Sequence, residues 1–269
     1  MKLKNILQEK RNYEFYSISP SSLHDCGRSL TYKYLNIEPS DPPSLESMIN
    51  MESGNRLHEM FVSMLDDVIE TELIHEVEKF GFVFRYKLDA VTLENNTKII
   101  NEIKTVKDYQ FNKIYSTRLD TINHVRQLQL YLILEDLNQG RLIYFNRNDG
   151  MWFAYDFFRN NMKFNIIKKD LANNTPVVGW KDTFPLEFII QHHKQIELAV
   201  EQGELFKREY TLNVKKYNDM LLFKYQNNGI SYNSDWQCRY CSYKTKCWKL
   251  DEFNKSHYTT LSEFMHHEK

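Results

Sequence analysis

The chain of 269 residues lacks several features that would place it in particular classes. No run of about 18 apolar residues occurs, which excludes a conventional transmembrane helix. Residues 1–11 are charged and hold no apolar segment, so we expect no secretory signal, no membrane partner and a cytoplasmic location. No G-x-x-x-x-G-K motif followed by Ser or Thr is present, so the sequence gives no sign of an ATP-driven motor.

Neither sign of charge is in excess. The chain has 35 Lys and Arg against 36 Asp and Glu, a formal net charge of −1. Any nucleic-acid site must therefore be a local patch of positive charge. Hydrophobic residues make up 42% of the chain, enough for a sizeable core. We expect a single domain spanning 1–269.

Cysteine is scarce, with four in the whole chain. Disulfides are rare in the cytoplasm, so these cysteines are better explained as metal ligands. Cys238, Cys241 and Cys247 follow a C-x2-C-x5-C spacing, and Cys26 lies far upstream. Four thiolates can hold either zinc or an iron–sulfur cluster, and the spacing alone does not distinguish them, although the chemistry alone favours zinc. The alternative is four unrelated buried thiols.

Hydrophobic periodicity predicts an α/β fold with a mixed sheet. A short helix carrying Cys26 is expected after the helix-start signal at 19–23. Longer helices are predicted over 45–66, 118–135 and 185–210, the second of them largely buried. The predicted strands cover 74–79, 82–91, 98–105, 141–145 and 151–158, and 160–183 is predicted to be rich in loops.

A tight hairpin is predicted at Asn95-Asn96, because Asn tolerates the positive φ that a two-residue loop requires. This loop would pair Glu94 with Thr97 and, further along, Asp89 with Glu102. Their Cβ atoms would then lie roughly 5 Å apart. Like charges at that distance are unfavourable unless a cation lies between them. Lys104 would point to the same face as Glu102 because strand side chains alternate.

These residue types suit a divalent-cation site. Asp89 and Glu102 supply the oxygen ligands that hard cations prefer, and the carbonyl of Ile103 would add one more. His58, on the preceding helix, would favour Mn²⁺ over Mg²⁺. Lys104 would orient a water and offset charge that develops on a phosphate. The alternatives are a solvated surface cluster for the charged residues and a core histidine for His58.

Four short motifs occur in a fixed order: Gly54-Asn55-Arg56-Leu57-His58, Lys87-Leu88-Asp89, Asn101-Glu102-Ile103-Lys104 and Gln127-Leu128-Gln129-Leu130-Tyr131. The series resembles the PD-(D/E)xK nucleases of the RecB-like branch. The resemblance implies a restriction-endonuclease-like core whose mixed central sheet is flanked by helices. It implies metal ligation by His58, Asp89 and Glu102, a catalytic Lys104, and contact with DNA or positioning of the site by Gln127 and Tyr131. Tyr86 stands where this branch often has Gly, and Leu88 replaces the Pro of the superfamily name.

The cysteine arrangement resembles the iron–sulfur staple of certain RecB-like nucleases, among them the CRISPR-associated Cas-four family and the AddB subunit of bacterial recombination nucleases. The resemblance implies a [4Fe–4S] cluster on Cys26, Cys238, Cys241 and Cys247. It would join segments 17–40 and 185–250 around a nuclease core of about 44–160. Gly27 stands where Pro is frequent.

The resemblance further implies a deoxyribonuclease, an exonuclease on single strands or DNA ends, in a bacterium, an archaeon or a phage-infected host. Its role would lie in CRISPR adaptation beside an integrase, or in recombination and repair beside a helicase or recombination protein. The alternatives are an iron–sulfur module that binds DNA ends without turnover, and an RNA nuclease.

Two sets of residues are candidates for DNA contact. Lys107, Lys113, Arg118 and Arg126 follow the catalytic strand and would neutralise phosphates. Around the cysteines, Trp236, Tyr240, Tyr243 and Trp248 alternate with basic residues. Such a mixture suits stacking on single-stranded bases, and equally a packed shell around the cysteine site.

Overall fold

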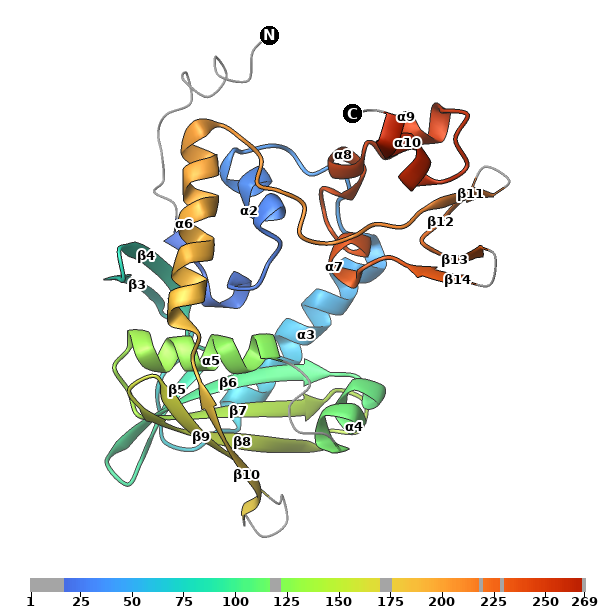
Figure 1. The fold of residues 1–269 in the computed structure, drawn as a ribbon. Helices are drawn as coiled ribbons and strands as arrows, with labels where there is room; N and C mark the ends of the chain where they lie inside the picture. Colours follow the sequence, from blue (N-terminus) through green and yellow to red (C-terminus); the bar gives the residue numbers. More distant parts are fainter. Residues whose placement is uncertain (1–16, 117–121, 170–175, 218–219, 228–229, 268–269) are drawn as a thin grey trace. The chain divides into compact units, whose positions relative to one another are not determined.

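The computed structural model describes residues 17–116, 122–169, 176–217, 220–227 and 230–267 (Figure 1). Within these residues the chain divides into two compact units. The first, here the core unit, comprises 17–24 and 45–190. The second, here the cysteine unit, comprises 25–44 and the residues from 191 onward. The expectation of a single domain over 1–269 stays a prediction.

A seven-stranded sheet in the order β10-β9-β8-β7-β6-β5-β2 forms the centre of the core unit. β6 and β7 pair in parallel and the neighbouring pairs are antiparallel, so the sheet is mixed, as predicted. The predicted α/β class, with a mixed sheet flanked by helices, is confirmed. The strands of this sheet are β2 Val68–Glu70, β5 Ala90–Glu94, β6 Thr97–Val106, β7 Gln139–Asn146, β8 Trp152–Asn160, β9 Lys163–Lys169 and β10 Pro176–Thr183.

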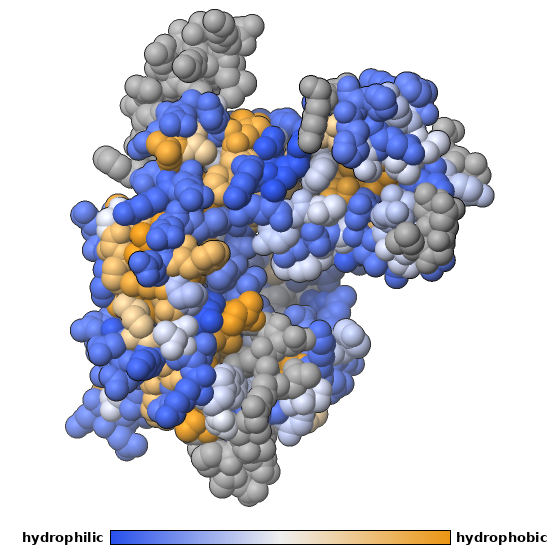
Figure 2. Space-filling model, in the orientation of Figure 1, coloured by the Kyte–Doolittle hydropathy of each residue, from blue (hydrophilic) through white to orange (hydrophobic). Residues whose placement is uncertain are grey.

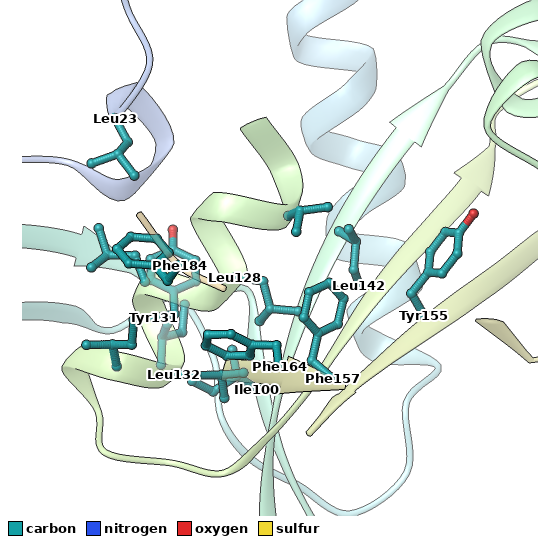
Figure 3. Packing of buried hydrophobic residues seen from close by; sticks show 14 of the residues in the cluster. Leu23, Ile100, Leu128, Tyr131, Leu132, Leu142, Tyr155, Phe157, Phe164 and Phe184 are labelled. Carbon is teal, nitrogen blue, oxygen red and sulfur yellow. The ribbon is translucent and has the colours of Figure 1, made fainter. Parts of the chain in front are cut away.

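The parallel pair is joined through two helices, α4 Asp108–Ser116 and α5 Ile122–Leu134. Every residue of α5 from Gln127 to Leu134 is buried, which confirms the predicted buried helix for the part that the structure describes. Leu128 and Leu132 of α5 lie among Ile100, Phe157 and Phe164 of the sheet (Figure 3). Gly140 permits this close packing, since a Cβ there would lie 3.0 Å from Leu128.

The predicted strand 82–91 was wrong as one strand. The chain forms β4 Phe82–Lys87, bends at Leu88-Asp89, and continues as β5 in a different sheet. β4 instead pairs with β3 Ile74–Lys79 and with β1 Ser17–Ile18 in a three-stranded sheet. Leu88 stays buried in the core at the bend, so the apolar pattern continues although the backbone changes partners. Helix α3 Leu45–Ser63 precedes these strands and is slightly shorter than predicted.

The prediction that 160–183 is rich in loops was also wrong. This segment holds β9 and β10, which pair with each other, and β9 also pairs with β8. The sign of a strand was the alternation of buried Phe164, Ile166 and Lys168 with more exposed neighbours. Frequent Asn and Lys residues, which are uncommon in strands, obscured that alternation.

Helices and two small hairpins build the cysteine unit. α6 Leu186–Gln202 ends earlier than the predicted 210, because Gly203 takes a positive φ of 68°. The other elements are α2 Gly27–Tyr34, the hairpins β11 Lys215–Tyr217 with β12 Met220–Leu222 and β13 Lys224–Asn227 with β14 Ile230–Asn233, and helices α7 Trp236–Arg239, α8 Lys244–Trp248, α9 Leu250–Lys255 and α10 Leu261–His267. The visible surface of α8 to α10 is mostly hydrophilic (Figure 2). None of the helices in the described residues has the length and apolarity needed to cross a membrane.

Candidate functional site

The hairpin that carries the candidate site forms with the predicted register. β5 and β6 pair from Glu94↔Thr97 to Ala90↔Asn101. Asn95 and Asn96 have φ values of 48° and 60°, as a two-residue loop between twisted strands requires. Asp89 lies one residue beyond the paired strand, at the bend.

The carboxylate of Asp89 replaces a backbone partner at this bend. Its Oδ2 accepts a 2.7 Å hydrogen bond from the N–H of Ile103, the residue after Glu102. The same Oδ2 lies 3.2 Å from Nε2 of His58 on α3. Asp89, His58 and the β6 motif therefore meet, as the sequence predicted.

Glu102 is the most buried member of the group, with 1% of its surface exposed. Its Oε1 lies 2.5 Å from Nζ of Lys104. Within the described part of the chain, its Oε2 has no hydrogen-bond partner. Nε2 of His58 is also buried, and its nearest acidic partner is Oδ2 of Asp89 at 3.2 Å, longer than the other contacts of the site. Buried polar atoms without partners are costly, and a bound cation is one way to satisfy them. Among the described residues, the ligand atoms that meet within 4.8 Å belong to His58, Glu72 and Asp89 and not to Glu102, so ligation by Glu102 stays a prediction.

The electrostatics of the site follow from burial and crowding. Burial, reinforced by the charge of Asp89, raises the pKa of Glu102 to about 7 despite the attraction of Lys104. Burial alone would lower the pKa of Lys104, but the charge of Glu102 and its hydrogen bond outweigh that effect and raise it. Lys104 is therefore an ammonium at neutral pH, so it can neutralise charge but cannot act as a general base.

Gln127 and Tyr131 lie one turn apart on α5 and reach the site through Lys104. Oε1 of Gln127 accepts a 3.0 Å hydrogen bond from Lys104 Nζ, and Nε2 of Gln127 donates a 2.9 Å bond to the hydroxyl of Tyr131. Tyr131 is 3% exposed. Of the two roles implied by the resemblance, these contacts favour positioning of the site.

Sequence reasoning missed one carboxylate. Side-chain atoms of His58, Glu72 and Asp89 lie within 4.8 Å of one another, which makes Glu72 a further candidate ligand. Glu72 takes a positive φ of 53°, donates its N–H to the carbonyl of Leu88, and pairs with Lys87. None of the quoted motifs includes it, because only the path of the chain between β2 and β3 brings it to Asp89.

All of these residues line one open pocket in the core unit with a volume of about 690 Å³. Most of its lining residues are polar or charged. Ile103 belongs to it as well, and ligation by the Ile103 carbonyl stays a prediction. The members used above are His58, Glu72, Asp89, Glu102, Lys104, Gln127 and Tyr131. A polar pocket of this size admits a hydrated cation together with a phosphate group.

The predicted DNA-contact residues are not equivalent. Lys107, which directly precedes α4, and Lys113, on α4, are both exposed. Arg126 lies 2.7 Å from Asp182 and also bonds to Gln129, so its charge is already neutralised. Arg118 lies outside the described residues. Contact of any of them with DNA stays a prediction.

The four cysteines, distant in sequence, line one small pocket of the cysteine unit. Cys238 and Cys247 are buried, and Cys26 and Cys241 are partly so. The backbone N–H of Tyr243 donates to Sγ of Cys241 at 3.4 Å. Burial, with smaller contributions from the other three thiols, raises the pKa of Cys238 to about 12. A bound metal would have to displace the thiol proton, as metals do when thiolates coordinate them.

Residues 38–41 are hydrogen-bonded to residues 245 and 246, next to Cys247. Asp41 accepts hydrogen bonds from the backbone N–H and the hydroxyl of Thr245, at 2.7 and 2.8 Å. Ser40 accepts the N–H of Lys246, and Lys246 Nζ donates to the carbonyl of Glu38. These bonds hold the start of the short helix α8, which carries Cys247.

Gly27, directly after Cys26, has two structural reasons to be glycine. Its N–H donates a 2.6 Å hydrogen bond to Glu209, which also contacts His192. A Cβ on Gly27 would lie 2.6 Å from the ring of Phe206. Proline, frequent here in the resembled nucleases, could not donate this bond.

The aromatic residues around the cysteines fall into two groups. Tyr243 is buried and stacks on Tyr32, and Trp248 packs beneath the guanidinium of Arg208. Trp236 and Tyr240 are 56% and 80% exposed. The first pair fits the packed-shell interpretation, and the second pair leaves the stacking interpretation open.

Comparisons with known proteins give likenesses of structure alone. No family model matches the chain, and no curated protein matches it. A solved structure of the protein SSO0001 is 19% identical, covers 91% of this chain and 93% of its own, and has a TM-score of 0.45. An alkaline exonuclease from Laribacter hongkongensis is 12% identical, with coverages of 74% and 95% and a TM-score of 0.44. A phage-related exonuclease from Haemophilus somnus is 14% identical, with coverages of 70% and 93% and a TM-score of 0.40. Likenesses this weak assign no activity to the chain.

Proposed function

We propose that this protein is a metal-dependent nuclease of the RecB-like PD-(D/E)xK type that hydrolyses DNA. The observation that carries the proposal is the pair of unsatisfied buried atoms, Oε2 of Glu102 and Nε2 of His58, beside the carboxylate of Asp89 and the ammonium of Lys104. A surface ion cluster would leave neither atom buried without a partner. A core histidine would find a protein partner of good geometry.

His58, Asp89 and Glu102 would hold the divalent cation, with Glu72 and the Ile103 carbonyl as further donors. One imidazole among carboxylates favours Mn²⁺, and Mg²⁺ is the alternative. Such a cation polarises a phosphate and lowers the pKa of a water molecule towards neutrality.

The chain's own residues supply the rest of the chemistry. The Lys104 ammonium, held by Glu102 and Gln127, stands ready to hydrogen-bond the attacking water and to offset negative charge on the phosphate oxygens. Lys104 donates to both carboxylate and amide, which restricts its position. Gln127 in turn is held by Tyr131.

For the cysteine pocket we propose a [4Fe–4S] cluster on Cys26, Cys238, Cys241 and Cys247, with zinc as the alternative. The four thiols line one pocket, which supports a group held by all four thiolates. Iron is favoured because one distant and three clustered cysteines resemble the arrangement in certain iron–sulfur RecB-like nucleases. The cluster or zinc ion would join Cys26 to the segment 238–247 within the cysteine unit.

We further propose that the substrate is single-stranded DNA or DNA ends. The role would be CRISPR adaptation beside an integrase, or recombination and repair beside a helicase or recombination protein. The order of the four core motifs and the cysteine pattern support these assignments. Cleavage of RNA and binding of ends without turnover remain outcomes of the test.

The test of activity uses the purified full chain with labelled single-stranded DNA, double-stranded DNA and RNA, in Mn²⁺, Mg²⁺ or EDTA. Metal-dependent loss of DNA is expected for wild type, and no loss for Glu102→Gln. Glu76→Gln, at an exposed carboxylate on β3, is the matched control and should cut normally. Cleavage of RNA but not of DNA would show that the substrate is RNA. Tight binding to DNA without any cleavage would defeat the proposal that the protein is an enzyme.

The test of the cysteine site is elemental analysis of protein purified without oxygen. A brown protein that absorbs at roughly 400 nm and holds about four iron atoms per chain supports the cluster. A colourless protein with one zinc and no iron defeats it.

A further inference from the structure

Tyr86 occupies a special place in the core unit. It is the residue that stands where the resembled nucleases often have Gly, and it lines the candidate pocket. Its ring lies between two others. It stacks on His75, its cross-strand neighbour on β3, at 5.3 Å between centroids, and packs on Tyr131 at 5.2 Å. Only 5% of Tyr86 is exposed.

The ring of Tyr86 is held from its polar end as well. Its hydroxyl donates a 2.5 Å hydrogen bond to Oε1 of Glu135, at the end of α5. The same oxygen lies 2.9 Å from Nδ1 of His75, and Nε2 of His75 lies 2.7 Å from Glu70. Burial, and then the bond to Glu135, raise the pKa of Tyr86, so the phenol remains a neutral donor. β2, β3, β4 and α5 are thereby tied together at this ring.

The consequence for the site lies in the orientation of the Gln127 amide. Lys104 can only donate, so it takes Oε1 of the amide, and Nε2 of Gln127 then donates to the hydroxyl of Tyr131. A reversed amide would present its NH₂ group to the ammonium and lose the bond to Lys104. The position of the Tyr131 hydroxyl therefore fixes where the Gln127 amide lies, and with it the bond to Lys104.

We propose that Tyr86, with His75 and Glu135, positions the catalytic lysine by fixing the Tyr131 ring and, through it, the Gln127 amide. The proposal rests on the nuclease function proposed above. Tyr86, His75 and Glu135 are positioning residues, since none of them contacts Lys104. The rival explanation is that they only hold β3 and β4 against α5.

A double-mutant cycle, measured on kcat, separates these explanations. Tyr86→Ala is expected to lower kcat by about 10- to 100-fold, as small misplacements of catalytic groups do, with KM for DNA within about twofold of wild type. Tyr86→Phe, which keeps the ring and loses the bond to Glu135, is expected to lose only a few-fold. In a Gln127→Ala background, Tyr86→Ala should cause little further loss of kcat. The contact between Gln127 and Lys104, through which Tyr86 is proposed to act, is already absent there. Multiplicative losses in the double variant would overturn the proposal.

A second readout does not depend on activity. The side-chain amide resonance of Gln127, assigned by its disappearance in Gln127→Glu, should shift in Tyr86→Phe. Tyr155→Phe is the matched control, because Tyr155 is also buried and donates its hydroxyl to a carbonyl elsewhere in the core, that of Ile114. An unmoved Gln127 resonance in Tyr86→Phe would overturn the proposal. A wild-type protein that cuts nothing would instead defeat the nuclease function, while this measurement would still decide the positioning.

Discussion

The N–H of Ile103 donates a 2.7 Å hydrogen bond to the carboxylate of Asp89. This bond continues the β5–β6 ladder one step beyond the last backbone pair, with a side chain in place of a carbonyl. It fixes Asp89 at the point where the chain leaves one sheet for another. The bend that interrupts the strand is therefore also what places a carboxylate beside Glu102.

Asp89 should be needed for both cation and geometry. Asp89→Asn keeps an acceptor for the Ile103 N–H but loses the charge, so we expect cleavage to fall by at least about 100-fold with little change in melting temperature. Asp89→Ala should lose cleavage equally and also about 1–2 kcal/mol of stability, because the N–H loses its partner. Calorimetric titration with Mn²⁺ and thermal melting measure the two effects. Activity near wild type in both variants would remove Asp89 from the site.

The raised pKa of Glu102 predicts a stability that depends on pH. The unfolded carboxyl titrates near 4.3, and the folded one titrates at about 7. Between these values the folded state keeps a proton that the unfolded state has released, so the stability of the metal-free protein falls as pH rises towards 7. The loss is on the order of 3–4 kcal/mol above pH 7.

Glu102→Gln removes this titration. In EDTA, its melting temperature relative to wild type should therefore rise from pH 5 to pH 8. Saturating Mn²⁺ should reverse the order at pH 8, because only wild type binds the cation. A difference between the two proteins that stays constant with pH would contradict the raised pKa.

Lys104 is expected to act in turnover and not in binding. Lys104→Ala should lose at least about 100-fold in kcat while Mn²⁺ and DNA still bind. It also leaves Glu102 without its cation, so the metal-free variant should be less stable at pH 8 than at pH 5. A matched Lys98→Ala, at an exposed position on β6, the strand that also carries Lys104, should retain kcat. Cleavage by Lys104→Ala at the wild-type rate would show that Lys104 has a structural role only.

Loss of Cys26 should affect folding more than loss of an ordinary buried thiol. The energy of metal or cluster binding is also folding energy when the ligands come from distant segments. We expect Cys26→Ala to lose its iron and to be clipped by proteases in the C-terminal segment. Limited proteolysis and elemental analysis measure this. Full iron content in the variant would exclude Cys26 as a ligand.

Gly27 gives a separate test of the packing around Cys26. Gly27→Ala places a Cβ against Phe206, and overpacking of this kind costs about 1–3 kcal/mol. Gly27→Pro also loses the bond to Glu209, so it should be the less stable variant and bind less iron. Gly179→Ala on β10 is the matched control, because a Cβ there would lie 3.7 Å from its nearest neighbour, an ordinary van der Waals contact. Equal stability of Gly27→Pro and wild type would contradict the packing described here.

The sequence by itself determined the hairpin and the central motif. Asn95-Asn96 can form only a few kinds of turn, and strand side chains alternate strictly, so the register that brings Asp89 towards Glu102 and Lys104 followed from local rules. The burial of α5 was equally readable, because its apolar residues surround the helix. These features depend on contacts between residues close in sequence.

Tertiary structure decided what local rules leave open. From Phe82 to Asp89 buried residues alternate with more exposed ones as in a single strand, and only the availability of different partners, β3 and β6, divides residues 82–91 into two strands. Glu72 reaches Asp89 because of a turn at positive φ, and Gln127 reaches Lys104 because α5 packs across β6. The free energy of such contacts comes from the packing of whole elements, whose order in space has no local signature in the chain.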